Sequence, residues 1–168
     1  ALNAAFFMGR PGSKRNQFPD PMSLPGFQEA ASRYYEAMDS MCHRLLALYA
    51  LAAEMPAGYF DGYFDPALAT LRITEYPAVR AAEDQWGIDP HTDAGFMTLL
   101  PSNPLDGLQI RPAGADWFPI NQEPRSFVVN SGDMLRRWSN DRFLSTTHRA
   151  INEAGKTRYA IPFFFDPR

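Results

Sequence analysis

The sequence has little cysteine, no long apolar run and no concentration of basic charge. Its single cysteine, Cys42, cannot form an internal disulfide, and no second cysteine is present to suggest a thiolate metal site. We therefore expect a reducing, cytoplasmic setting. No stretch approaches the roughly 20 consecutive apolar residues that a transmembrane helix needs, and the first residues do not resemble a signal peptide. We expect no membrane association.

The charge and the size of the chain narrow the class of protein further. The net charge is −3 and there is no long basic run, so the electrostatic footprint of a nucleic-acid-binding protein is missing. We expect no nucleic-acid partner. A chain of 168 residues with 45% hydrophobic composition is sufficient for one packed core. Because it does not begin with methionine and ends just after an apolar run, we expect it to be part of a longer protein.

The first part of the chain changes from loop-like to helical composition. Residues 1–24 are rich in proline, glycine and polar groups and are predicted to be a loop-rich remnant of a longer N-terminal region. Residues 25–69 are predicted to be helical support, with a long amphipathic helix that Pro56 ends and a short helix near Asp65 to Ala69. The apolar face of the long helix is predicted to comprise Phe27, Ala31, Tyr34, Met38, Met41, Leu45, Leu48 and Ala52.

The remaining residues, 70–168, are predicted to form a β-rich core. Short runs with high β-propensity are separated by proline, glycine and asparagine at spacings typical of an antiparallel sandwich or jelly roll. These runs are 71–76, 96–100, 107–110, 126–130 and 158–165. The fold class is therefore mainly β with flanking helices, and the long helix is expected to pack outside the jelly roll.

The pair His91 and Asp93 suggests a metal site. Two residues apart on a strand, the imidazole and the carboxylate lie on one face. The chain has only three histidines; His43 lies in the predicted helix, which leaves His148 as the candidate third ligand. Two histidines and one carboxylate are the facial ligand set of non-heme Fe(II) oxygenases. Zn(II) could use similar ligands, and a lone His-x-Asp is more often an ordinary polar pair near a sheet edge.

Several separate motifs decide between these alternatives. They are the segments 91–100, 107–110, 128–133, 138–140, 148–149 and 158–164. In order and spacing they resemble the isopenicillin-N-synthase-like family of Fe(II)/2-oxoglutarate-dependent dioxygenases, from about Leu71 to Pro167. The resemblance implies a distorted double-stranded β-helix in which His91, Asp93 and His148 bind Fe(II), with 2-oxoglutarate and dioxygen as cosubstrates.

The same resemblance implies residues that bind the cosubstrate. Arg158, ten residues after His148, would pair with the distal carboxylate of 2-oxoglutarate, which suits a permanently charged, planar guanidinium. Tyr76 would help to hold the same molecule. Two positions depart from the family pattern: Ala160 stands where relatives commonly have serine, and Thr74 where many have asparagine. These departures raise the question of which cosubstrate is used.

The implied activity is oxidation of a small organic molecule, by hydroxylation or desaturation, with release of succinate and carbon dioxide. Phe164 and Asn130 match family positions near the substrate. A group of arginines around His148 would either attract an anionic substrate or pair with surface acids such as Asp133 and Asp141. These arginines are Arg136, Arg137, Arg142 and Arg149. The alternatives to this function are an iron-dependent oxidase of the same fold that does not use 2-oxoglutarate and a non-catalytic jelly-roll binding domain.

Overall fold

The structure, a computed structural model, divides into two compact units. It describes residues 2–79, 82, 85–152 and 155–168. The first unit consists of Ala1–Phe6 and Arg72–Pro162, and the second of Phe7–Leu71 and Phe163–Arg168. Strand β1 (Ala4–Met8) and strand β2 (Leu68–Tyr76) each continue from one unit into the other. The predicted boundaries after residues 24 and 69 stay predictions.

The second unit is built on the long helix α1 (Phe27–Ala52), which confirms the prediction of an amphipathic helix. The final strand, β10 (Phe163–Asp166), pairs antiparallel with the beginning of β2. The Tyr35 ring meets the Phe163 ring edge-on at 5.0 Å, and the Tyr35 hydroxyl donates a 3.2 Å hydrogen bond to the carbonyl oxygen of Ala69. Aromatic packing and this bond hold α1 against the strand pair.

The buried face of α1 differs in part from the predicted face. Ala31 and Met38 are buried as expected, but Leu48 is 60% exposed. The helix buries Ala31, Tyr35, Met38, Cys42, Leu46 and Ala50. Apolar residues occupy two adjacent stripes of this helix, and a period of 3.6 residues fits either stripe. Packing against β10 selects one of them.

Two local predictions for the second unit were wrong. The segment Asp65 to Ala69 is not helical; a 3₁₀ turn, η1 (Asp61–Tyr63), comes earlier and β2 already begins at Leu68. The N-terminal segment is not all loop either, because β1 occupies Ala4–Met8. The loop was predicted from the proline and glycine that follow this segment. Pairing with a neighbouring strand can stabilise a short strand even when such residues follow it.

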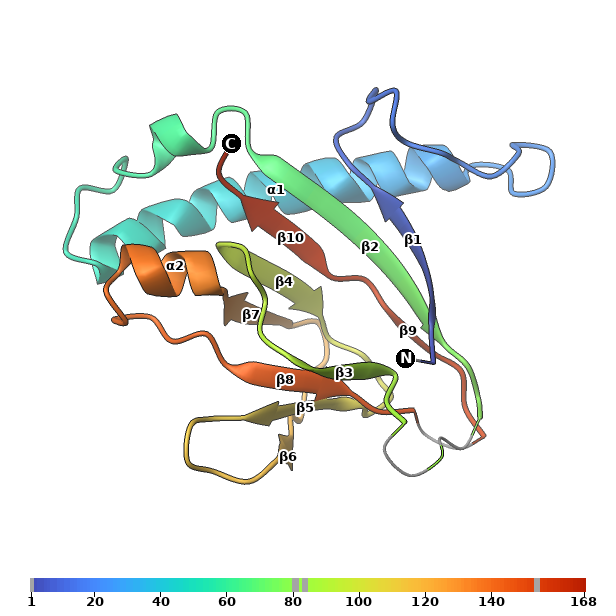
Figure 1. Ribbon diagram of the computed structural model, residues 1–168. Coiled ribbons are helices and arrows are strands. Elements are labelled where there is room, and N and C mark those ends of the chain that lie inside the picture. Colours follow the sequence, from blue (N-terminus) through green and yellow to red (C-terminus); the bar gives the residue numbers. More distant parts are fainter. Residues whose placement is uncertain (1, 80–81, 83–84, 153–154) are drawn as a thin grey trace. The chain divides into compact units, whose positions relative to one another are not determined.

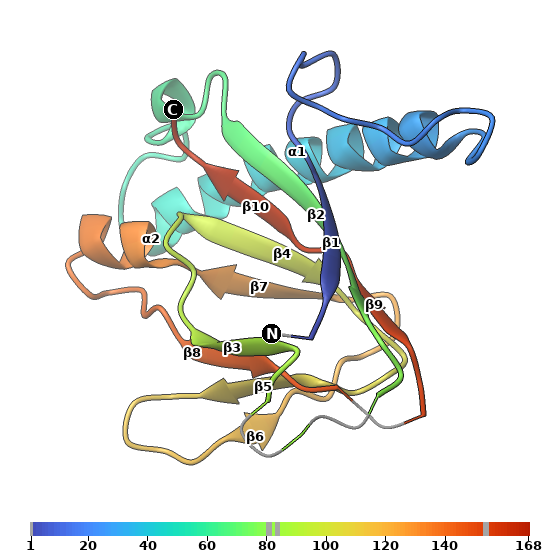
Figure 2. The same ribbon diagram turned by 45° about the vertical axis from the view of Figure 1, so that its right-hand side comes forward.

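The first unit contains a four-stranded antiparallel sheet in the order β3-β8-β5-β6 (Figures 1 and 2). Its strands are β3 (Ile88–His91), β5 (Leu108–Arg111), β6 (Phe118–Pro119) and β8 (Thr147–Ala150). The same unit contains the antiparallel pair of β4 (Met97–Pro101) and β7 (Phe127–Ser131). A short helix, α2 (Asp133–Trp138), follows β7.

Strand β9 (Arg158–Ala160) pairs antiparallel with the end of β2. The sequence predicted a continuous strand from Arg158 to Phe165, but β9 ends at Ala160 and β10 begins at Phe163. Pro162 lies in the interruption, where its missing N–H cannot take part in a ladder. The predicted runs 71–76, 96–100, 107–110 and 126–130 are confirmed as strands with ends shifted by a few residues.

None of the helices in the described ranges has both the length and the apolar character needed to cross a membrane.

Candidate active site

Two histidines lie opposite each other on neighbouring strands of the first unit. His91 ends β3 and His148 lies in β8, and the antiparallel register pairs the two residues directly. Their ring centroids are 4.3 Å apart. The two side chains therefore meet across one strand pair, although they lie far apart in the sequence.

Asp93 completes the group from the loop that follows β3. One of its carboxylate oxygens, Oδ1, lies 3.7 Å from His91 Nε2 and 3.6 Å from His148 Nε2. The strand ends at His91, so the predicted common face of one strand does not explain the arrangement. The loop brings Asp93 to the histidines instead. Within the described residues, this trio is the one histidine, cysteine and acid group with ligand atoms close enough to hold a metal ion.

The hydrogen bonds of the two rings show which nitrogen atoms are available. His91 Nδ1 lies 2.7 Å from the carbonyl oxygen of Asp89, and His148 Nδ1 lies 3.1 Å from that of Thr146. A carbonyl oxygen can only accept, so each Nδ1 carries a proton and each neutral ring presents a lone pair at Nε2. Burial lowers the pKa of His148, an effect that the Asp93 charge opposes.

Three electron-pair donors therefore face one another: two Nε2 atoms and the Oδ1 of a buried carboxylate. Without a proton or cation between them, lone pairs and a negative charge at this separation repel one another. A divalent metal ion would reverse the sign of these interactions. Nitrogen, nitrogen and carboxylate oxygen is the donor set of non-heme Fe(II) oxygenase sites, so the residues fit the metal that the sequence predicts.

The second carboxylate oxygen of Asp93 is held by two neighbouring strands. Thr98 Oγ1 on β4 donates a 2.6 Å hydrogen bond to Oδ2, and Asn130 Nδ2 on β7 donates one of 2.8 Å. Thr98 and Asn130 are register partners. Both donors contact Oδ2, which leaves Oδ1 facing the histidines. The sequence did not single out Thr98. It assigned Asn130 to the substrate pocket, and this role stays a prediction; the structure shows Asn130 in contact with Asp93.

A tight backbone contact holds the loop that carries Asp93. The Asp133 N–H donates to the Asp93 carbonyl at 2.8 Å, and the Gly132 N–H donates to the Phe96 carbonyl at 3.0 Å. A Cβ atom on Gly132 would lie 2.1 Å from the carbonyl oxygen of Gly95. Only glycine allows the turn after β7 to approach the loop that carries Asp93 so closely.

A buried cation lies in the same unit, at the pairing of β2 with β9. Arg158 is 4% exposed and stands opposite Tyr76, which is 3% exposed. The guanidinium carbon lies 5.1 Å from the centre of the Tyr76 ring. Burial lowers the pKa of Arg158 and raises that of Tyr76, and each side chain opposes the shift of the other. The structure therefore brings together the two residues expected to bind the cosubstrate.

The negative charge of Asp106 acts on Arg158 and opposes the lowering of its pKa by burial. Arg158 Nε donates a 3.4 Å hydrogen bond to the carbonyl oxygen of Leu105. Gly107, with φ of 148°, leaves space for the side chain, because a Cβ there would lie 3.1 Å from Arg158 Nε. A buried guanidinium stays charged and is costly without a counter-charge. The buried guanidinium is therefore suited to binding an anion.

One face connects the two groups. His148 and Ala150 are two residues apart on β8 and so lie on the same side of that strand. Ala150 packs with Tyr76 and Ala160 in one buried cluster. The face of β8 that carries His148 therefore continues into the buried cluster that contains Tyr76, the cross-strand partner of Arg158.

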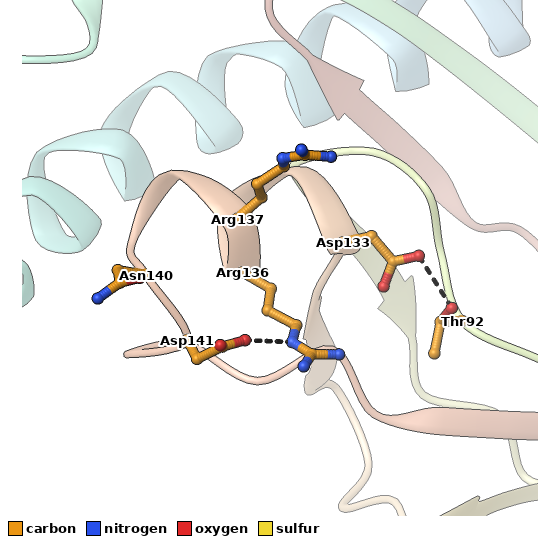
Figure 3. A pocket seen from close by; sticks show the side chains of 6 residues that line it. All are labelled: Thr92, Asp133, Arg136, Arg137, Asn140 and Asp141. Carbon is orange, nitrogen blue, oxygen red and sulfur yellow. Dashed lines mark hydrogen bonds and ion pairs between the residues drawn. The ribbon is translucent and has the colours of Figure 1, made fainter.

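The arginines around His148 have partners of two kinds. Arg136 Nε lies 2.5 Å from Asp141 Oδ1 (Figure 3). Arg136 and Asp141 line a pocket of about 480 Å³ together with Thr92. The Thr92 hydroxyl donates a 3.0 Å hydrogen bond to Asp133. This confirms surface pairing for Arg136. The guanidinium carbon of Arg149 lies 4.1 Å from the centre of the Trp86 ring and 4.2 Å from that of the Trp117 ring.

Two further predictions, one for His43 and one for Phe164, concern the second unit. His43 lies on α1, 3.8 Å from Asp39 and against the ring of Phe165, as expected for a helical residue outside the metal group. Phe164 lies in β10 opposite Thr70. Its expected place near the substrate stays a prediction.

Comparison with known proteins gives a consistent result. The model of the 2OG-Fe(II) oxygenase superfamily matches residues 67–167. The 2-oxoglutarate-Fe(II) type oxidoreductase hxnY of Emericella nidulans is 37% identical over 95% of this chain and 47% of its own length. The 2-oxoglutarate-dependent dioxygenase ecdK of Aspergillus rugulosus is 34% identical over 91% of this chain and 51% of its own. The chain thus spans about half the length of these relatives.

Solved structures agree with the fold prediction. The crystal structure of a full-length Neurospora crassa protein in complex with alpha-KG and thymine has a TM-score of 0.92 at 28% identity, covering 99% of this chain and 54% of that one. A 2OG-Fe(II) oxygenase family protein from Caulobacter crescentus, described as putative, has a TM-score of 0.85 at 28% identity, covering 98% and 57%. The predicted jelly-roll fold is confirmed.

Proposed function

This chain belongs to the 2OG-Fe(II) oxygenase superfamily, and we propose that it forms the core of an Fe(II)- and 2-oxoglutarate-dependent dioxygenase. The observation that carries the proposal is the set of three electron-pair donors from His91, Asp93 and His148 that face one another. The buried pair of Arg158 and Tyr76 supports it, since 2-oxoglutarate has a second carboxylate for a guanidinium to bind.

Each residue has a defined task in this proposal. His91, Asp93 and His148 hold the metal, while Arg158 and Tyr76 bind the distal carboxylate and so orient the cosubstrate. The buried cluster around Ala150 keeps water away from the cosubstrate. When bound, iron and 2-oxoglutarate would supply the oxidation itself, with release of succinate and carbon dioxide.

We propose a small organic molecule as the substrate. A similar Neurospora crassa protein was crystallised in complex with alpha-KG and thymine. In this chain, Thr92, next to Asp93, lines a pocket of about 480 Å³. Hydroxylation and desaturation are both compatible with the same site. The cytoplasmic setting and the lack of a nucleic-acid partner stay predictions from composition.

Anaerobic spectroscopy tests the proposal directly. Addition of 2-oxoglutarate to the Fe(II)-loaded chain should produce the weak visible charge-transfer absorption of the iron chelate. His148→Ala should abolish this absorption, because one of three ligands is lost, whereas His43→Ala is the matched control and should retain it. Arg158→Ala should bind iron normally but need far more 2-oxoglutarate for the same absorption.

Other outcomes favour the alternatives. Iron binding without the absorption, together with substrate-dependent oxygen uptake, would favour an oxidase that does not use 2-oxoglutarate; Ala160 in place of serine is the sequence feature that keeps this alternative open. No iron binding, and no effect of His148→Ala on any ligand, would favour a non-catalytic binding domain.

A further inference from the structure

The pairing of strand β3 with the rest of its sheet is interrupted close to His91. The order β3-β8-β5-β6 places β3 at an edge, where it pairs with β8 (Figure 2). Ile88 pairs with Ala150 and His91 with His148, so three steps along β3 span two steps along β8. The register shift is that of a β-bulge, and Pro90, which has no N–H to donate, lies inside it. A short, interrupted ladder therefore holds His91 opposite His148.

A second connection between these two strands lies on the opposite face of the sheet. Arg149 follows His148 in β8, and successive side chains of a strand point to opposite faces. The guanidinium carbon of Arg149 lies 4.1 Å from the centre of the Trp86 ring, within the range of a cation–π contact. Trp86 lies two residues before β3 begins at Ile88. This contact therefore joins the chain just before β3 to the residue beside His148.

Arg149 is itself held by the other neighbour of β8. Its cross-strand partner on β5 is Gln109, whose side-chain oxygen accepts a 2.8 Å hydrogen bond from Arg149 Nε. The guanidinium carbon also lies 4.2 Å from the centre of the Trp117 ring, and β6 begins at the next residue. Arg149 is partly buried, and a guanidinium withdrawn from water gains more from an aromatic ring than an exposed one does. Arg149 is thus a fixed point to which Trp86 can attach.

We propose that Arg149 is a positioning residue for the metal site: through its contact with Trp86 it holds β3 against β8 and keeps His91 opposite His148. The inference rests on the proposed function, in which both histidines hold the metal. Metal–ligand bonds tolerate only small changes in length, so an outward shift of the edge strand would remove His91 Nε2 from the other donors. This role differs from the two that the sequence suggested for Arg149, attraction of an anionic substrate and pairing with a surface acid.

Anaerobic titration with Co(II) tests the contact, because it gives both a metal affinity and a visible ligand-field spectrum. Trp86→Leu removes the aromatic ring and should weaken Co(II) binding about tenfold and change the spectrum. Trp86→Phe keeps an aromatic face and should bind Co(II) within about twofold of the unmodified chain. Arg111→Leu is the matched control. Arg111 lies 4.9 Å from the centre of the Trp117 ring on β5, which β8 separates from β3, so its loss should leave affinity and spectrum unchanged.

A double-mutant cycle shows whether the two side chains act through one contact. Arg149→Leu should weaken Co(II) binding at least as much as Trp86→Leu does. The double variant should bind Co(II) no more weakly than Arg149→Leu, because either substitution already removes the contact. Losses that multiply would mean that the two side chains act independently and would overturn the inference. Arg149→Lys is a milder change that keeps the charge but not the planar group, and it should also weaken Co(II) binding several-fold.

The melting temperature separates positioning from general stabilisation. A lower melting temperature of Trp86→Leu, with Co(II) affinity and spectrum unchanged well below that temperature, would show that the contact serves only the fold. Equal weakening by Trp86→Leu and Trp86→Phe, or by Arg111→Leu, would also contradict the inference. If the unmodified chain binds no Co(II), the proposed function itself fails and the inference fails with it. If the unmodified chain binds Co(II) and the Trp86 and Arg149 variants bind it equally well, the positioning role alone is wrong.

Discussion

The two carboxylate oxygens of Asp93 have different neighbours. Oδ1 faces the two histidine Nε2 atoms, whereas Oδ2 accepts hydrogen bonds from Thr98 and Asn130. Two donors on one oxygen fix the rotation of the carboxylate before any metal binds. Such outer hydrogen bonds orient metal-binding carboxylates and affect metal affinity.

We expect Thr98→Val to weaken metal binding by about tenfold. The valine cannot donate to Oδ2, so the carboxylate is held by Asn130 alone and more of its orientations become accessible. Anaerobic titration with Mn(II) or Co(II) measures the effect. Thr98→Ser keeps the hydroxyl and is the matched control; if it weakens binding as much as Thr98→Val, packing rather than the hydrogen bond would be responsible.

At the scale of elements, the turn between β7 and α2 is attached to the loop that follows β3. Three successive N–H groups, of Gly132, Asp133 and Met134, donate to carbonyl oxygens of Phe96, Asp93 and Gly95. The start of α2 thus positions the loop that carries Asp93, which comes from another part of the chain. Close approach of the two backbones depends on the absence of a side chain at Gly132.

Gly132→Ala should therefore disturb both the fold and the site. Its Cβ would meet the backbone of Gly95 at 2.1 and 2.7 Å, and backbone atoms cannot move aside as a side-chain end can. We expect a loss of about 1–3 kcal/mol of unfolding free energy together with weaker metal binding, measured by denaturant unfolding and by Mn(II) titration. Gly62→Ala is the matched control, since a Cβ there meets nothing within 4 Å; equal behaviour of the two variants would contradict the role of Gly132.

At the scale of the whole molecule, binding and stability are linked. The predicted metal ligands come from β3, the following loop and β8, and the buried pair of Tyr76 and Arg158 comes from β2 and β9. None of these groups assembles in an unfolded chain, so ligands that bind them favour the folded state.

Saturating ligand should raise the melting temperature accordingly. Mn(II) and 2-oxoglutarate at about 100 times their dissociation constants stabilise by about 2.7 kcal/mol per independent site. For a chain of this length that corresponds to about 5–10 °C. Thermal unfolding with and without both ligands measures the shift. His148→Ala should lose the metal-dependent part and His43→Ala should keep it; a shift that survives in His148→Ala would place metal binding elsewhere.

The sequence by itself predicted which residues carry the chemistry. His91, Asp93, His148 and Arg158 were singled out because several separate motifs agree in order and spacing with those of one oxygenase family, whereas the His-x-Asp pair alone would not have been specific. Strands such as 71–76 and the helix ending before Pro56 were predictable for a similar reason: local propensity and periodicity are written in adjacent residues.

Only the tertiary structure decided how those residues are held. Thr98 and Asn130 matter because register pairs them beside Asp93. Gly132 was one glycine among 11 until its contact with Gly95 was known. The buried stripe of α1 was chosen by Phe163, far along the chain. Hydrogen bonds and packing between residues distant in sequence leave no pattern in the adjacent residues. Such a contact depends on a residue elsewhere in the chain, and only the folded structure shows which one.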